Sequence, residues 1–137
     1  MSQDNVEIVR EVLALFNRGA SGEDVAPRLE ELFAADVRID MSRRVFNPEV
    51  YEGHDGLRRL RDEVRDVWES FRITPERFVD AGDRVVVLET RRGKGRASGV
   101  EVEHRSAVIW TPRDNQVIGM QTDLEPQVAL EAVGLPE

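Results

Sequence analysis

The residues best suited to proton transfer are two aspartates near the ends of strand-like segments. Asp40 lies in a run that alternates apolar and polar side chains, and Asp123 stands close to the end of another such run. A carboxylate held in a partly apolar site acts as a general acid or base. We therefore take Asp40 and Asp123 as candidate catalytic residues.

Each aspartate also has a purely structural interpretation. The apolar residues of the run 36–41 occupy one strand face, so Asp40 is expected to point outward unless the strand slips or carries a bulge. In the last strand-like run Thr122 falls on the inward face, which turns Asp123 outward unless the strand end twists. Asp123 stands near Pro126 and in that case caps a final helix.

Two arginines are candidates for binding a ligand. Arg91 shares a strand face with Val87 and Glu89, and an inward guanidinium needs an acidic partner or an anionic ligand. Glu89 is the nearest such partner, and the alternative interpretation is an ion pair at a strand end. Arg105 faces inward if Ala107 does.

Further candidates for ligand contact are aromatic or lie on the last strand. Tyr51 is expected in the loop before a third helix, and Trp68 on that helix, where core packing is the alternative. Met120 and Thr122 lie on the inward face of the last strand. These four residues complete the predicted ligand-binding set.

The sequence favours neither a metal site nor a cofactor. It contains no cysteine, which excludes thiolate nucleophiles and cysteine-ligated metals. The histidines, His54 and His104, are far apart in the sequence. His104 is expected at the sheet surface or in an interface.

Composition indicates one soluble domain spanning residues 1–137, with 40% hydrophobic residues and enough length to bury a core. The net charge of −8 disfavours nucleic acid as a partner. The basic cluster at 91–96 is interspersed with glycine, as in a solvated hairpin end. We expect no signal peptide, no membrane-spanning run and a cytoplasmic location.

Hydrophobic periodicity predicts an α+β fold. Apolar residues recur at helical spacing early in the chain and alternate with polar ones later. The predicted helices span 4–19, 24–35, 57–71 and 126–133. The predicted strands span 36–41, 71–79, 84–92, 100–111 and 116–124, and Pro75 places the second of them at a sheet edge.

Three segments, 32–37, 51–57 and 114–120, carry a resemblance to a known family. In this order and spacing the chain resembles the SnoaL-like branch of the nuclear transport factor two-like superfamily, which also includes polyketide cyclases, ketosteroid isomerases and limonene epoxide hydrolases. The resemblance implies a cone-shaped, curved antiparallel sheet wrapped around three N-terminal helices, with a short C-terminal helix. It also implies a pocket for a small apolar molecule inside the cone.

The ketosteroid isomerase apparatus is not matched. By the resemblance, the tyrosine of the oxyanion hole falls on Val12, and the late-strand acid falls on Ala107. The proton-moving aspartate falls on Met41, one residue from Asp40. We therefore expect no standard ketosteroid isomerase activity.

The epoxide hydrolases and the SnoaL-like polyketide cyclases differ in which of their site residues are matched here. The epoxide hydrolase arginine falls on Arg91, but its two aspartates fall on Gly93 and Thr122, which excludes the standard hydrolase. The acid of SnoaL-like polyketide cyclases falls within 123–125, where Asp123 is present.

The sequence thus favours a domain that binds a small apolar molecule, with a cyclase or isomerase acting by proton transfer as the catalytic option. The alternative is a noncatalytic dimerisation or interaction module whose pocket is closed by side chains. We expect a homodimer that uses the face of Val100, Val102, Val108 and Trp110, since this stripe is more apolar than the opposite face.

Overall fold

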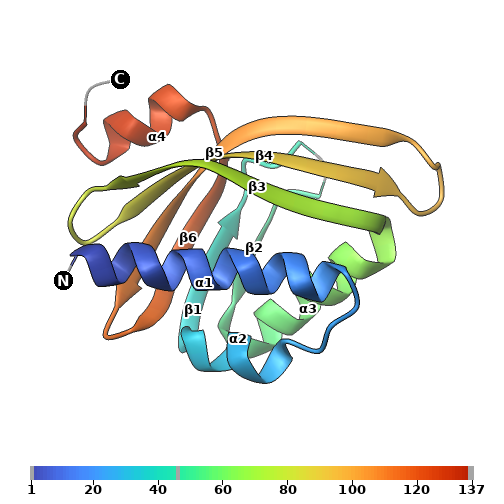
Figure 1. Ribbon diagram of the computed structural model, residues 1–137, viewed down its shortest axis with the longest axis horizontal. Helices are drawn as coiled ribbons and strands as arrows, with labels where there is room; N and C mark the ends of the chain where they lie inside the picture. The colour runs from blue at the N-terminus through green and yellow to red at the C-terminus, as the bar shows by residue number, and fades with distance from the viewer. Residues whose placement is uncertain (1, 46, 136–137) are drawn as a thin grey trace.

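A curved six-stranded sheet forms the centre of the molecule in the computed structural model, which describes residues 2–45 and 47–135 (Figure 1). The helices are α1 (Ser2–Ala20), α2 (Ala26–Leu32), α3 (Gly53–Val67) and α4 (Pro126–Ala132). The strands are β1 (Phe33–Met41), β2 (Glu49–Glu52), β3 (Trp68–Asp80), β4 (Val85–Gly95), β5 (Glu101–Arg113) and β6 (Gln116–Leu124). Their order in the sheet is β2-β1-β6-β5-β4-β3, and β1 pairs with β6 in parallel while the other neighbours are antiparallel. This confirms the predicted α+β cone.

The first three helices lie against one side of the sheet and α4 against the other (Figure 1). Helix α1 buries Val9 and Val12 completely, because these residues recur at helical spacing along one face. Phe16, one turn further on, has its ring centroid 6.4 Å from that of Trp110 on β5. The apolar stripe of α1 therefore fixes the helix over the inner face of the sheet.

The register of β4 and β5 decides which side chains enter the cone. Val85 pairs with Trp110 and Val87 with Val108, and all four residues belong to the main core beneath α1. The alternate residues face outward, and there Ala107 packs in a second cluster with residues of α4. One sheet thus carries a core on each face.

This arrangement reverses the predicted faces of β5. Trp110 and Val108 were expected to form a dimer interface, but each is only 1% exposed inside the monomer. The prediction was wrong because the face of β5 that carries Ala107 was taken as the inner one. That face is the outer one, and it is covered by α4. Among the predicted interface residues only Val100 and Val102, near the tip of the β4–β5 hairpin, remain exposed.

The third helix also ends earlier than predicted. It stops at Val67, and Trp68 takes extended backbone angles and begins β3. The Trp68 ring lies against Gly93, where a Cβ atom would stand 2.7 Å from it. The apolar residues at 68 and 71 are therefore strand residues that happen to continue the helical spacing, and the absence of a side chain at Gly93 leaves room for the indole ring.

Strand β2 was not predicted. Its Tyr51, expected in a loop, pairs with Ile39 of β1 and is fully buried. Four residues give too short an alternation to distinguish a strand from a loop. The helix that follows starts at Gly53, whose φ of 69° suits glycine at this abrupt turn.

The edge strand β3 is tied to α1 by one side chain. Asn17 donates a hydrogen bond from Nδ2 to the carbonyl of Ile73 (2.7 Å) and accepts one at Oδ1 from the Ile73 N–H (2.8 Å). An edge strand otherwise leaves such backbone groups without a partner in the sheet. Pro75, as predicted, also lies on this edge.

Within the described residues, none of the helices combines the length and apolar character needed to cross a membrane.

Replacing Asn17 by alanine should lower the free energy of unfolding by about 1–3 kcal/mol, because two partly buried backbone groups of Ile73 lose their partner. Urea denaturation measures the change. Asn5→Ala is the control, since Asn5 makes one exposed hydrogen bond to Gly82, and its cost should be clearly smaller. Equal losses in both variants would contradict this account of the edge.

Candidate functional site

A bulge near the end of β6 decides where Asp123 points. Ile109 of β5 pairs with Gln121 and Ala107 with Leu124, so Thr122 and Asp123 together lie opposite the single residue Val108. Asp123 adopts a φ of 61°, which aspartate tolerates better than most residues. The extra residue turns Asp123 toward the inner face, although simple alternation had placed it outside.

Asp123 meets three polar side chains there. The hydroxyl of Thr122 donates a hydrogen bond to Asp123 Oδ2 (2.6 Å). Asp123 Oδ1 lies 3.7 Å from Arg91 Nη1 and 3.9 Å from His104 Nε2. The aspartate side chain is only 12% exposed, whereas that of His104 is 60% exposed, so the cluster reaches solvent on the His104 side.

The second acid of the cluster is Glu89. Arg91 donates a hydrogen bond from Nε to Glu89 Oε2 (2.5 Å), and the two side chains are 16% and 1% exposed. Within the described residues no acceptor takes a hydrogen bond from the Nη groups of Arg91. Arg91 is thus hydrogen-bonded at Nε, and its Nη1 faces Asp123 at 3.7 Å while the Nη hydrogens remain available to a ligand oxygen.

In the part of the chain that the structure describes, several buried polar atoms on this face lack a hydrogen-bond partner. Glu89 Oε1 and Ser106 Oγ make no hydrogen bond within the described residues, and Glu89 and Ser106 are direct neighbours in the β4–β5 register. Trp110 Nε1, further along β5, also makes no hydrogen bond within the described residues. Buried polar atoms without partners are uncommon in native proteins, and water or a ligand generally satisfies them.

This arrangement suits proton transfer. Asp123 is an acceptor on a partly buried carboxylate, and Arg91 offers donors to an oxygen on which negative charge develops. The predicted residues Arg91, Thr122 and Asp123 are therefore brought together. Met120 lies nearby in the main core, 6% exposed and paired with Trp110.

Asp40 lies elsewhere. It pairs with Val50 and Gln121 on the outer face, and its Oδ1 accepts hydrogen bonds from the hydroxyl (2.6 Å) and the backbone N–H (2.9 Å) of Ser42. These bonds, the hydroxyl foremost, lower the pKa of Asp40 below its ordinary value. An outward carboxylate with a lowered pKa is a poor general base, which supports the structural interpretation of Asp40.

Arg105 also faces outward. Its side chain is 70% exposed and forms an ion pair with Glu76 at 3.1 Å. Arg105 and Ala107 share one face of β5, as predicted, but this face lies outside the cone. The structure therefore places Arg105 away from the predicted pocket.

Tyr51 forms a separate network beneath α3. Its hydroxyl accepts a hydrogen bond from Arg44 Nη2 (3.0 Å) and donates to the carboxylate of Glu63 (3.1 Å), while Arg59 lies over its ring at 4.6 Å. Burial is the largest effect on its pKa, which lies above the ordinary tyrosine value. No contact joins this network to Asp123 within the described residues.

Trp68, by contrast, lies on the inner face with Gly93, one inward position beyond Arg91.

The isomerase template is also corrected in part. Val12 is buried beneath the sheet, as an inward position should be, but Ala107 is on the outer face. The inward neighbours of Ala107 are Ser106 and Val108, so the ungapped match placed the late acid on the wrong face. The inward acid on the adjacent strand β4 is Glu89, and on the adjacent strand β6 it is Asp123.

Sequence reasoning did not assign His104 and Ser106 to the site. Both alternate with Val108 and Trp110 along β5, and both follow these residues into the cone. The signal was present in the apolar character of Val108 and Trp110, which marks their face as the inner one.

The surface has two hollows near the sheet, and neither is lined by Glu89, Arg91 or Asp123. One, of about 370 Å³, lies between α1 and β3. The other, of about 590 Å³, lies over the far ends of β3, β4 and β5. Among the described side chains, no three His, Asp or Glu residues are grouped to hold a metal ion.

Residues 9–120 match the family profile described as a SnoaL-like domain. No curated protein sequence matches the chain.

Solved structures share the fold at low sequence identity. A nuclear transport factor two-like protein of unknown function from Burkholderia pseudomallei is 21% identical, with a TM-score of 0.76 over 96% of this chain and 98% of that one. A putative SnoaL-like polyketide cyclase from Jannaschia sp. CCS1 is also 21% identical, with a TM-score of 0.74 over 98% and 94% of the two chains. TerC, co-crystallised with polyporic acid, is 23% identical, with a TM-score of 0.73 over 95% and 98%.

Replacing Arg91 by methionine should lower the free energy of unfolding by about 3 kcal/mol, because Glu89 then keeps a buried charge without its partner. Urea denaturation measures the loss. Adding Glu89→Gln to this variant removes the orphaned charge and should restore part of the stability. Arg92→Met is the matched control: Arg92 and Glu103 form an exposed pair, so the change should stay within about 1 kcal/mol. A similar loss at positions 91 and 92 would show that the Glu89–Arg91 pair is not a buried, coupled unit.

Proposed function

The chain belongs to the SnoaL-like domain family, and from that membership and the inner polar cluster we propose that it binds a small, largely apolar carbonyl compound and transfers a proton by way of Asp123. The observation that carries the proposal is the bulge that directs Asp123 into the cone beside Arg91. Catalysis by an acid near the end of the last strand is what the resemblance to polyketide cyclases implies.

The proposed step is an enolisation. Asp123 takes a proton from the carbon next to the carbonyl, and the electrons of the broken C–H bond move into the new C=C bond and onto the carbonyl oxygen. The Nη groups of Arg91, which donate no hydrogen bond within the described residues, stabilise the negative charge on that oxygen. In a substrate whose enolate is conjugated to a C=C bond, return of the proton to the far carbon of that bond completes an isomerisation. In a substrate with a second carbonyl, attack of the enolate carbon on that carbonyl closes a ring, and the alkoxide that forms takes the proton from Asp123.

The surroundings favour a ligand with an apolar body. Trp68 and Phe71 lie 6.0 Å apart on the inner face near Gly93, and Val108 lines the same face beside the polar cluster. Apolar area supplies most of the affinity in such sites, while a few polar groups fix the orientation. The partly exposed His104 marks the side from which a ligand reaches Asp123.

One observation favours the noncatalytic alternative. The interior beneath α1 is filled by large side chains, since Trp110 is 1% exposed and Phe33 is fully buried. Neither hollow described above opens onto Asp123. A module with a closed pocket would bind no ligand at the cluster, and this distinguishes it from the proposed enzyme.

A homodimer and a cytoplasmic location, both expected from the sequence, remain part of the proposal. The interface moves to the tip of the β4–β5 hairpin, where Val100 and Val102 are 57% and 45% exposed. Light scattering should give a dimeric mass at micromolar concentration, and Val102→Asp should shift the mass toward the monomer. A monomeric wild-type protein would contradict the dimer.

The catalytic proposal predicts exchange of the acidic C–H protons of 2-tetralone for deuterium in heavy water, followed by proton NMR. Asp123→Asn should slow the exchange by about 10²–10⁴-fold, because it removes the base while asparagine tolerates the same positive φ. Asp40→Asn is the control and should leave the rate unchanged, since Asp40 faces outward.

Tryptophan fluorescence with 2-tetralone and with polyporic acid, the compound co-crystallised with TerC, measures binding separately. Binding without exchange by the wild-type protein would reject the catalytic step and retain the pocket. No binding of either compound would favour the closed module. Loss of exchange in the Asp40 variant alone would show that the wrong carboxylate has been assigned.

A further inference from the structure

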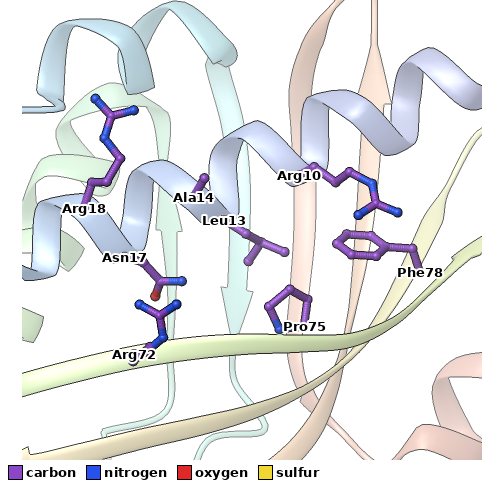
Figure 2. A pocket seen from close by; sticks show the side chains of 8 residues that line it. All are labelled: Arg10, Leu13, Ala14, Asn17, Arg18, Arg72, Pro75 and Phe78. Carbon is purple, nitrogen blue, oxygen red and sulfur yellow. The ribbon is translucent and has the colours of Figure 1, made fainter.

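The groove between α1 and β3 combines guanidinium groups with an apolar floor (Figure 2). Leu13 of α1 and Pro75 and Phe78 of β3 form the floor, while Arg10, Arg18 and Arg72 line it. This groove lies along the β3 edge of the sheet and contains none of the residues around Asp123. Three arginines in one groove are notable in a chain of net charge −8.

Two of these arginines already share their charge. Arg18 forms an ion pair with Glu23, and Arg10 lies 3.6 Å from Glu7 while its guanidinium covers the Phe78 ring at 4.2 Å. Arg72 differs, because within the described residues it makes no hydrogen bond or ion pair, and its side chain points toward α1 beside Asn17 (Figure 2). Arg72 is therefore the group in the groove that retains a full charge and all its donors.

We propose that this groove binds an amphipathic carboxylate, with its carboxyl group on Arg72 and its apolar body on Leu13, Pro75 and Phe78. A guanidinium binds a carboxylate through two parallel hydrogen bonds, which fixes the headgroup. The volume of about 370 Å³ lies within the range of small-molecule sites. Charge complementarity and the apolar floor together select an anion that carries a hydrocarbon body over a simple inorganic anion.

The groove also has a rigid wall. Asn17, which lines it, holds the edge of β3 through both of its amide atoms, so the spacing between α1 and β3 is set without a ligand. A preformed site loses less entropy on binding than one that must be assembled. The proposal does not depend on the chemistry assigned to Asp123.

Sodium octanoate is a suitable probe. The control compounds are acetate, which lacks the apolar body, and 1-octanol, which lacks the charge. Titration followed by amide chemical shifts should give the strongest changes in residues 10–18 and 72–78. Octanoate should bind more tightly than acetate or 1-octanol, and added salt should lower its affinity because the headgroup contact is ionic. Shifts concentrated in residues 104–107 and 122–124 would place octanoate in the cone and overturn the proposal.

The decisive variant is Arg72→Gln, which should raise the dissociation constant of octanoate about tenfold. Arg77→Gln is the matched control, because Arg77 is an exposed arginine on the same strand that does not line the groove. Arg72→Lys should fall between wild type and Arg72→Gln, since lysine keeps the charge but not the fork of donors. Equal affinities for the wild-type protein and Arg72→Gln, with both folded by circular dichroism, would overturn the proposal.

Discussion

The extra residue in β6 is the constraint on which the site depends. In an unbroken ladder, Asp123 would point to the outer face and the inner face would carry Thr122 alone. With two residues opposite Val108, the chain bends and Asp123 turns inward with a positive φ. A conformation of this kind costs about 1–3 kcal/mol and persists where its surroundings hold it, and here the Thr122 hydroxyl and the Arg91 guanidinium do so.

The inner face of β4 explains why such a polar cluster is tolerated inside the cone. Glu89 is almost fully buried, and removal of one partner from a buried ion pair is more costly than the pair itself is stabilising. Arg91 satisfies one carboxylate oxygen of Glu89. Among the residues that the structure describes, the other oxygen has no hydrogen-bond partner, and neither has the neighbouring Ser106 hydroxyl. A stable fold gains little from such atoms, so their presence on the same face as Asp123 supports a role in binding. The apolar packing of α1 over Trp110 supplies the stability that allows this departure.

Much of the fold could be predicted from the sequence because helix and strand periods are long in α1, β4 and β6. The shorter elements could not be: β2 has four residues, and Trp68 and Phe71 continue the spacing of α3 although they belong to β3. For the site, alternation correctly placed Arg91 and Glu89 on the inner face of β4. It misplaced Arg105, because the more apolar face of β5, that of Val108 and Trp110, was assigned to a dimer interface, whereas it packs in the core beneath α1 and the Ala107 face packs against α4. The inward turn of Asp123 depends on a bulge, which one strand's sequence does not specify without its partner's register.

A crystal structure of the 2-tetralone complex tests the central claim most directly, through the backbone angle at residue 123 and the place of the ketone oxygen. The account predicts a positive φ at Asp123, with its carboxylate facing the carbon beside the carbonyl and the ketone oxygen within hydrogen-bonding distance of Arg91. An unbroken β6 ladder with Asp123 on the outer face, or a ketone bound away from Arg91, would contradict it.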